Sequence, residues 1–208
     1  HPCLVYVAVY ATEDTDFGIT ASEYNTIVEL SEGQPQHDEV YSRTETYFSY
    51  TEITQAPGGA LGWVAPDLSL VVTADSGDPN IYITCTNATA AQRASGEAET
   101  PMPDRLHYHT YTWSSTAYGR GEDVLIPAKS SGRGHGYLDI CDPLGEAGSV
   151  TFIIGVWCQS AVSTEFSIVA SSVAAGSGMG ESIVSIADGA PTNGYVQLGG
   201  LHYYSMIL

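Results

Sequence analysis

The chain has 208 residues, of which 43% are hydrophobic, so it can bury a core and form one large domain or a domain with an extra lobe. It carries 24 Asp and Glu against 6 Lys and Arg, which gives a formal net charge of −18 at pH 7. Because nucleic acids and anionic membranes are bound through Lys and Arg, this charge argues against both as partners. It favours divalent cations, basic partners or simply a solvated acidic surface.

Short segments rich in Val, Ile, Tyr and Thr run through the chain, and helical periodicity is almost absent. The segments either alternate or are apolar throughout, and turns containing Gly, Pro, Asn or Asp separate them. This pattern predicts an all-β protein, an antiparallel β-sandwich of the jelly-roll or immunoglobulin-like type with little helix. The predicted strands, in chain order, are 4–10, 47–53, 68–74, 80–84, 123–128, 151–157, 165–171, 182–187 and 203–208.

Two segments far apart in the chain share one order of elements. Each contains an Ile-Val-x-hydrophobic strand, a Gly-x-Pro turn and an aromatic strand: IVELSEGQPQHDEVYSRTETYFSYTEI (27–53) and IVSIADGAPTNGYVQLGGLHYYSMIL (183–208). Pro35 aligns with Pro191 at an offset of 156 residues (191 − 35), and the aromatic strands align at the same offset. The sequence therefore indicates a repeat of about 156 residues.

The N-terminal residues extend this repeat. YVAVYATEDTDFGITAS (6–22) is similar to IIGVWCQSAVSTEFSIVAS (153–171), with Val9 aligned to Val156 and small length changes after it. We therefore expect one complete sandwich flanked by partial units, in a chain that is either mature or an excised segment. The expected parts are the closing strands of a preceding repeat (1–22), the complete unit (27–171), a Gly/Ser linker (172–182) and the opening strands of the next repeat (183–208).

Four pieces in this order resemble the pre-peptidase C-terminal type of β-sandwich, which occurs in secreted bacterial proteins and in large extracellular repeat proteins. The first is the Gly-x-Pro turn with its aromatic strand, described above. The others are LSLVVTADSGDPNIYIT (68–84), YTWSSTAYGRGEDVLIPA (111–128) and VTFIIGVWCQSAVSTEFSIVAS (150–171). The resemblance implies an extracellular β-sandwich. Calcium-binding members of the family use acidic residues at the domain entrance, a region that Glu29 and Glu32 match loosely.

One turn offers a second cation site. Asp75, Asp78 and Asn80 cluster around a glycine, and their side-chain oxygens are of the type that binds Ca²⁺. The same residues also suit an Asx-rich turn whose side chains bond to the local backbone. Both interpretations stay open, and calcium is the cofactor that we expect if the chain binds one.

Cysteines and a glycosylation motif point to an oxidising, extracellular setting. The disulfide candidates are Cys3, Cys85, Cys141 and Cys158, which allow three pairings. Asn87 opens the motif Asn-Ala-Thr and is the predicted site of an N-glycan.

The sequence gives little support for catalysis, so we expect no enzyme. No Gly-x-Ser-x-Gly motif occurs. On a strand, His107 and His109 would share one face, which suits either a metal site or an exposed sheet surface. Trp113 and Trp157 are expected to seal the sandwich core, and Gly155 marks a bulge or a close approach of the backbone.

We therefore expect an extracellular structural protein, a repeating unit of a filament or cell-surface array that assembles head to tail and carries glycans. The units would be tandem repeats or protomers that exchange terminal strands. The expected partners are copies of the chain itself, with no membrane span. The alternative is a substrate-binding module, for polysaccharide or a collagen-like polymer, of a secreted hydrolase. The expected assembly contacts are Leu4, Val5, Val7, Val9, Tyr203, Tyr204, Met206 and Ile207.

Overall fold

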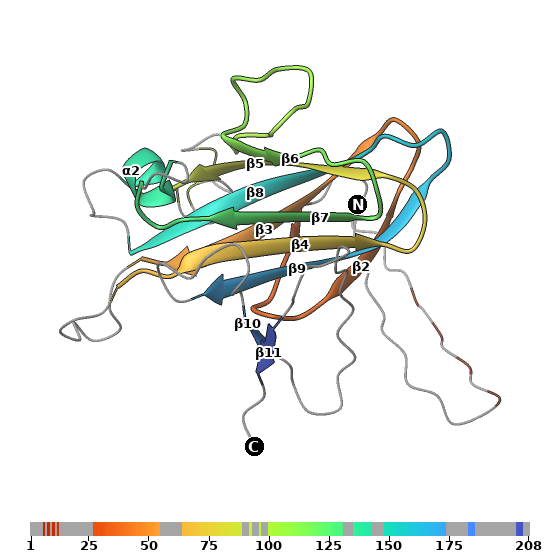
Figure 1. Ribbon diagram of the computed structural model, residues 1–208, viewed down its shortest axis with the longest axis horizontal. Coiled ribbons are helices and arrows are strands. Elements are labelled where there is room, and N and C mark those ends of the chain that lie inside the picture. Colours follow the sequence, from red (N-terminus) through yellow and green to blue (C-terminus); the bar gives the residue numbers. More distant parts are fainter. Residues whose placement is uncertain are drawn as a thin grey trace.

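The computed structural model describes residues 27–54, 64–88, 100–130, 135–142 and 148–173, together with residues 6, 8, 10, 12, 92 and 96 and the backbone of two short C-terminal strands. Two β-sheets pack face to face (Figure 1). The predicted all-β sandwich is therefore confirmed.

The first sheet has five strands in the order β1-β3-β8-β5-β6. β1 and β3 are parallel, whereas every other neighbouring pair in this sheet is antiparallel. The strands are β1 (Val28–Glu29), β3 (Glu45–Ile53), β8 (Ser149–Cys158), β5 (Pro79–Thr86) and β6 (Trp113–Ser115).

The second sheet has four antiparallel strands in the order β2-β9-β4-β7. They are β2 (Gln36–Val40), β9 (Thr164–Val173), β4 (Asp67–Ala74) and β7 (Gly121–Ile126). A short helix, α2 (Tyr137–Cys141), precedes β8. Outside the sandwich, β10 (Ile183–Ser185) and β11 (Tyr203–Ser205) form a two-stranded sheet of their own.

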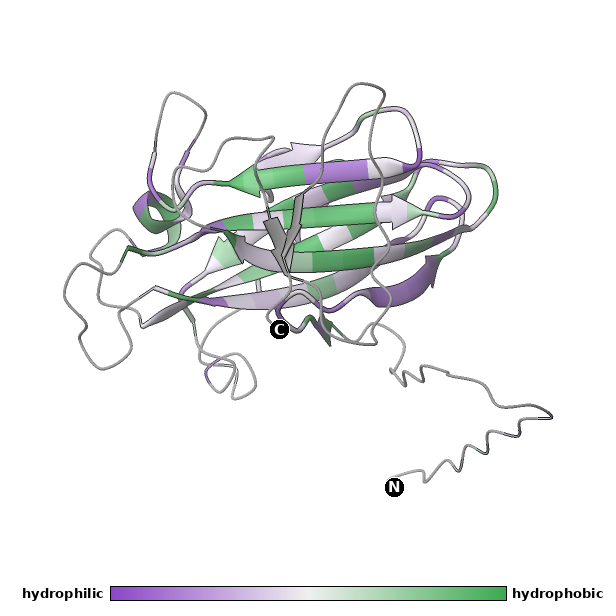
Figure 2. Cartoon of the chain, turned by 60° about the horizontal axis from the view of Figure 1, so that its bottom comes forward, coloured by the Kyte–Doolittle hydropathy of each residue, from purple (hydrophilic) through white to green (hydrophobic). Residues whose placement is uncertain are grey.

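Alternation along the strands places the core between the sheets. In β4, Leu68, Leu70 and Val72 are fully buried, because side chains two residues apart point to the same face. Phe48 of β3 meets Phe166 of β9 edge to face, with ring centroids 5.9 Å apart, so these two rings join the sheets. Burying a large apolar side chain of this kind stabilises the fold by about 1.5–3 kcal/mol. Figure 2 shows hydrophobic residues concentrated along the strands.

A polar network fastens one corner of the sandwich. The Ser172 amide of β9 donates to Glu32 Oε1 at 2.9 Å, and Ser172 Oγ donates to Glu52 Oε2 of β3 at 2.6 Å. The Tyr50 hydroxyl also donates to Glu32. Burial raises the pKa of the Glu52 carboxyl, and the charge of Glu32 raises it further. The turn after β1 is thereby tied to both sheets.

One disulfide joins Cys85 at the end of β5 to Cys141 at the end of α2, with Cα atoms 6.0 Å apart. Cys158 is a buried free thiol that donates to the carbonyl of Val162 at 3.1 Å. Cys3 lies outside the described residues. This bond rules out the two of the three possible pairings that join Cys85 or Cys141 to another cysteine. A disulfide fits an oxidising, extracellular environment.

Candidate functional site

A parallel strand pair opens the sandwich. Val28 of β1 lies opposite Phe48 of β3, and Glu29 lies opposite Ser49. The Leu30 amide continues the pairing by donating to the Ser49 carbonyl at 2.8 Å. This parallel contact sets β1 and β3 apart from the rest of the sandwich, where neighbours are antiparallel.

The C-terminal strands pair in the same way. β10 and β11 are parallel, with Val184 opposite Tyr204 and Ser185 opposite Ser205. Each of these residues lies 156 positions after its counterpart in β1 or β3, since 184 − 28, 204 − 48, 185 − 29 and 205 − 49 all equal 156. The pairing of the C-terminal strands thus has the same direction, the same register and the same offset as the repeat read from the sequence.

The conformation of the turn after β1 explains why this position of the repeat is a glycine. Gly33 has φ of 64°, a left-handed conformation that glycine adopts without strain, and its amide donates to the Ala170 carbonyl at 2.9 Å. Gly189 stands 156 residues later in the sequence, outside the described residues. A conserved turn geometry would require glycine at both positions.

β3 and its counterpart β11 differ in the strands that pair with them among the described residues. β3 lies between β1 and β8, and it pairs with β8 along its full length from Glu45 to Ile53. Within the part of the chain that the structure describes, β11 pairs with β10 alone. Among the described residues, no strand takes beside β11 the position that β8 takes beside β3.

Two of the eight predicted assembly residues lie within the described part of the chain. Tyr203 and Tyr204 lie in β11. Near the other end of the chain, Tyr6 and Tyr10 are 87% and 88% exposed. The remaining predicted contacts, Leu4, Val5, Val7, Val9, Met206 and Ile207, lie outside the described residues.

A second surface lies on the outer face of the first sheet. Gly155 of β8 is directly opposite Tyr47 of β3 on one side and Tyr82 of β5 on the other. A Cβ atom at Gly155 would lie 3.2 Å from Tyr47 Cε1 and 3.3 Å from the Pro103 carbonyl oxygen. The predicted close approach at Gly155 is therefore confirmed. The segment 100–112 crosses the sheet at this point, which explains why β8 is buried on both faces.

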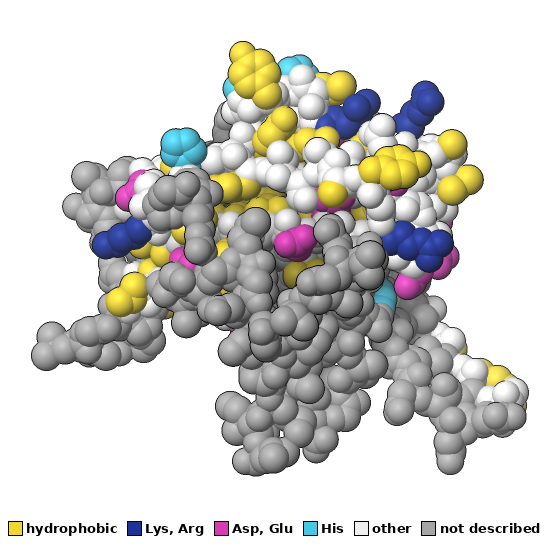
Figure 3. All heavy atoms as spheres, in the orientation of Figure 1, with side chains coloured by type: hydrophobic (Ala, Val, Ile, Leu, Met, Phe, Trp, Pro, Cys, Tyr) yellow, Lys and Arg dark blue, Asp and Glu magenta, His cyan; other side chains and the backbone are white. Residues whose placement is uncertain are grey.

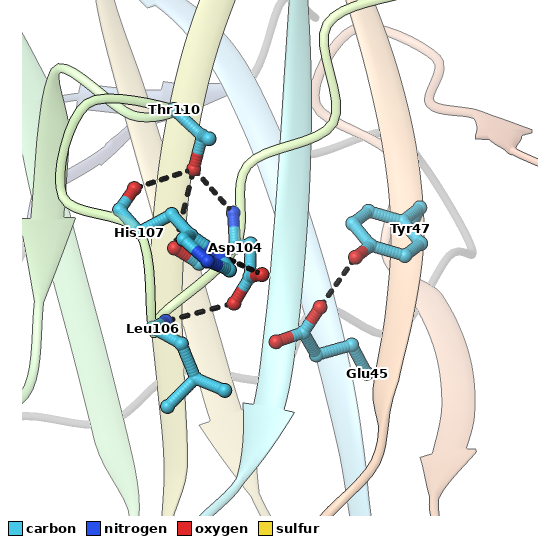
Figure 4. A network of polar contacts seen from close by, with 6 residues as sticks. All are labelled: Glu45, Tyr47, Asp104, Leu106, His107 and Thr110. Atoms are coloured by element: carbon cyan, nitrogen blue, oxygen red, sulfur yellow. Dashed lines mark hydrogen bonds and ion pairs between the residues drawn. The ribbon is translucent and has the colours of Figure 1, made fainter.

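Residues 104–110 form a fixed loop above this face, which we call the 104–110 loop (Figure 4). The Asp104 carboxylate accepts from the Leu106 amide at 2.7 Å and contacts His107 Nδ1 at 2.6 Å. These two hydrogen bonds lower the pKa of Asp104. Thr110 Oγ1 accepts from the Asp104 amide and donates to the His107 carbonyl. The loop presents Tyr108, which is 82% exposed, to solvent, and hydrophobic and histidine side chains gather at the top of Figure 3.

The expectation that His107 and His109 lie on a strand is wrong, because the Asp104 side chain closes a turn at this point. Their rings are 5.8 Å apart. Among the described residues, no group of three or more His, Cys, Asp or Glu side chains is placed to hold a metal ion.

The two tryptophans differ. Trp113 packs against the core near Phe152, with centroids 6.2 Å apart, as predicted. The prediction is wrong for Trp157, which lies on the outer face because its neighbour Val156 occupies the inner one. The Arg105 guanidinium stacks on the Trp157 ring, 3.9 Å from its centroid, so this tryptophan belongs to the surface beneath the 104–110 loop.

Two residues of the Asp-rich turn have protein partners. Asp78 Oδ1 accepts from the Gly119 amide at 3.0 Å, and the buried Asn80 hydrogen-bonds to Tyr82. Asp75 is exposed. The turn is therefore held to the loop before β7, and the calcium site at Asp75, Asp78 and Asn80 stays a prediction.

Two further sequence features are located by the structure. Asn87 is exposed directly after β5. β9 continues to Val173, two residues beyond the expected end of the complete unit at 171. No helix within the described ranges is long and apolar enough to cross a membrane.

No family model matches the chain, and no curated protein matches it. Among solved structures, it is similar to the pre-peptidase C-terminal domain of a collagenase from Bacillus anthracis. The two share 6% sequence identity and a TM-score of 0.35, and the match covers 72% of this chain and 99% of that domain. That domain is of the type that the sequence resembles.

Proposed function

We propose that this chain is a β-sandwich repeat of an extracellular structural protein, which assembles head to tail into a filament or a cell-surface array. The observation that carries the proposal is the parallel pair β10–β11, which repeats the register of β1–β3 at an offset of 156 residues. A second set of opening strands would begin another sandwich that follows the first.

Strand addition to β11 would supply the physical means of assembly. A strand edge presents unpaired N–H and C=O groups, and an added strand satisfies them through main-chain hydrogen bonds. A contact between different surfaces at the two ends of a chain is heterologous, so it produces an open filament unless its rotation closes a ring.

Three features of the chain suit an extracellular protein. The Cys85–Cys141 disulfide is stable in an oxidising environment. We propose that Asn87, exposed at the end of β5, carries a glycan that shields the assembly from proteases. The net charge of −18 keeps separate assemblies apart through repulsion.

The proposal is tested by comparing the full chain with a chain that lacks residues 183–208. Sedimentation and negative-stain electron microscopy should show fibres for the full chain and a monomer after the deletion. Tyr108→Asp is the control, because Tyr108 is exposed on the 104–110 loop and should leave fibres intact. A full chain that stays monomeric at all concentrations would contradict the proposal.

The aromatic outer face favours a second candidate, a module that binds a polysaccharide or collagen-like polymer for a secreted hydrolase. Tyr108 is exposed on the 104–110 loop, which also carries the Arg105 that stacks on Trp157, and aromatic side chains stack on ligands. Affinity gels with each polymer test it. Tyr108→Ala should weaken retention, whereas the matched variant Tyr41→Ala, exposed after β2, should not. Equal retention of both variants would remove this candidate.

A further inference from the structure

We propose that His107 and His109 form a binding site for Cu²⁺, in which Asp104 orients the His107 ring. Each imidazole supplies one nitrogen to the metal, and water fills the remaining positions. The site lies on the 104–110 loop and is independent of the proposed assembly.

Hydrogen bonds fix the backbone that carries both histidines. The His107 amide donates to the Asp104 carbonyl at 3.1 Å, and the Thr110 amide donates to the His107 carbonyl at 2.8 Å. Thr110 Oγ1 joins the same two residues, because it accepts from the Asp104 amide at 2.8 Å and donates to the His107 carbonyl at 2.7 Å (Figure 4). A loop held in this way loses little conformational freedom when a ligand binds.

The Asp104 side chain sets the orientation of the His107 ring. Asp104 Oδ2 lies 2.6 Å from His107 Nδ1, and Asp104 Oδ1 accepts from the Leu106 amide at 2.7 Å. These two hydrogen bonds lower the pKa of Asp104, so its carboxylate is ionised and accepts the hydrogen of Nδ1. In the neutral His107 ring, Nε2 then carries the lone pair that a metal requires. A carboxylate on the other ring nitrogen is the usual partner of a metal-binding histidine.

His109 lies within reach of the same metal ion. The ring centroids of His107 and His109 are 5.8 Å apart. With metal–nitrogen distances of about 2.0–2.1 Å, two imidazoles on one ion can have their centroids up to about 6.4 Å apart. The observed separation lies within this limit, so one ion can bind both rings.

The pair is open to solvent, as a site with water ligands requires. The His107 side chain is 58% exposed, and His109 is exposed as well. Arg105 is the one Lys or Arg in residues 104–110, and its guanidinium stacks on Trp157. The net charge of −18 also favours the approach of a cation.

Two imidazoles and water favour copper over zinc. Zinc sites use three or four protein ligands, whereas no group of three His, Cys, Asp or Glu side chains that could hold a metal occurs in the part of the chain that the structure describes. At a given nitrogen site, Cu²⁺ binds more tightly than the other divalent ions of the first transition row. Its tetragonal geometry accepts water in the positions that the protein leaves.

Copper titration tests the site in a chain that keeps His107 and His109 as its only histidines, which we call the pair-only chain. Its substitutions are Cys3→Ser, His1→Ala, His37→Ala, His135→Ala and His202→Ala. Calorimetry should show one Cu²⁺ per chain, and electron paramagnetic resonance should show hyperfine coupling to two imidazole nitrogens. Adding His107→Ala or His109→Ala should weaken binding by more than about tenfold and leave coupling to one nitrogen at most.

Two further variants of the pair-only chain separate binding from positioning. Asp104→Asn keeps the shape of the side chain and removes its charge, so it should weaken copper binding by about tenfold. Leu106→Ala is the matched control, because its side chain is 68% exposed on the same loop and its amide is retained. The control should bind Cu²⁺ as the pair-only chain does.

The unsubstituted chain gives a readout that does not depend on the replacements. In NMR spectra, substoichiometric Cu²⁺ should broaden the imidazole signals of His107 and His109 before that of His37, which is exposed on β2. Equal broadening of His37 would overturn the inference, as would coupling to a single nitrogen in the pair-only chain or copper affinity unchanged by His107→Ala or His109→Ala. Unchanged affinity in Asp104→Asn would overturn the orienting role of Asp104.

Discussion

The disulfide between Cys85 and Cys141 should be a major source of stability. The bond closes a loop between residues separated by 56 positions, and this loop contains β6, β7 and the 104–110 loop. Replacing both cysteines with serine frees the end of β5 from α2 while leaving the strand pairing of β5 with β8 in place.

The expected loss follows from the length of the closed loop. Loop closure removes about 2.1 + 1.5R ln n cal/mol/K from the entropy of the unfolded chain. For a separation of 56 residues, this amounts to about 14 cal/mol/K, or about 4 kcal/mol at 25 °C. The free energy of unfolding should therefore fall by about 3–5 kcal/mol in the double variant.

Urea denaturation followed by tryptophan fluorescence measures this difference. The matched control is Cys158→Ser, which changes a buried thiol that forms no disulfide and already sits among the oxygens of Val162 and Thr164. A serine hydroxyl can use the same partners, so the control should lose about 1 kcal/mol or less. A double variant that loses no more than the control would refute the entropic argument.

Three further substitutions test the packing and the polar corner. Phe48→Ala should lower the free energy of unfolding by about 3–5 kcal/mol in urea denaturation, because it removes the ring that joins the sheets. The control Ser49→Ala, on the same strand, should lower it little, and equal losses would contradict the assigned core. Gly155→Val should lower the free energy of unfolding by about 1–3 kcal/mol, because its side chain would collide with Tyr47 and Pro103. The displaced segment 100–112 should then be cleaved faster by a protease, and unchanged cleavage would contradict the close approach. Burial raises the pKa of Glu52 above its ordinary value of 4.5, so its contribution to stability is complete below that pH and is lost as the pH rises toward the raised value. Glu52→Gln should therefore gain stability relative to the unsubstituted chain as the pH rises above 4.5, unlike the exposed Glu29→Gln, and a pH-independent difference would contradict the assignment.

The long strands could be predicted from sequence because each buries an alternating or continuous apolar face. β4, β5, β8 and β9 are of this kind. β2 escaped prediction because its sequence, Gln-His-Asp-Glu-Val, is polar, and pairing with β9 at the sheet edge holds it in place. β6 has three residues, too few for a periodic signal.

The candidate site could be predicted from the sequence only in part. The offset of 156 residues is visible in the sequence, but a parallel pairing between β1 and β3 is not, because parallel direction leaves no mark on two short strands. Successive residues of a strand point to opposite faces of the sheet, so shifting the strand assignment by one residue moves Trp157 from one face to the other. The choice of Cys85 and Cys141 required the path of the chain through β5 and α2.

A residue-resolution cryo-electron microscopy map of the assembled protein tests the central claim most directly. The account predicts a fibre in which the C-terminal strands β10 and β11 of each chain contact the next chain. A fibre built through the 104–110 loop or another surface, with β10 and β11 outside the contact, would contradict it.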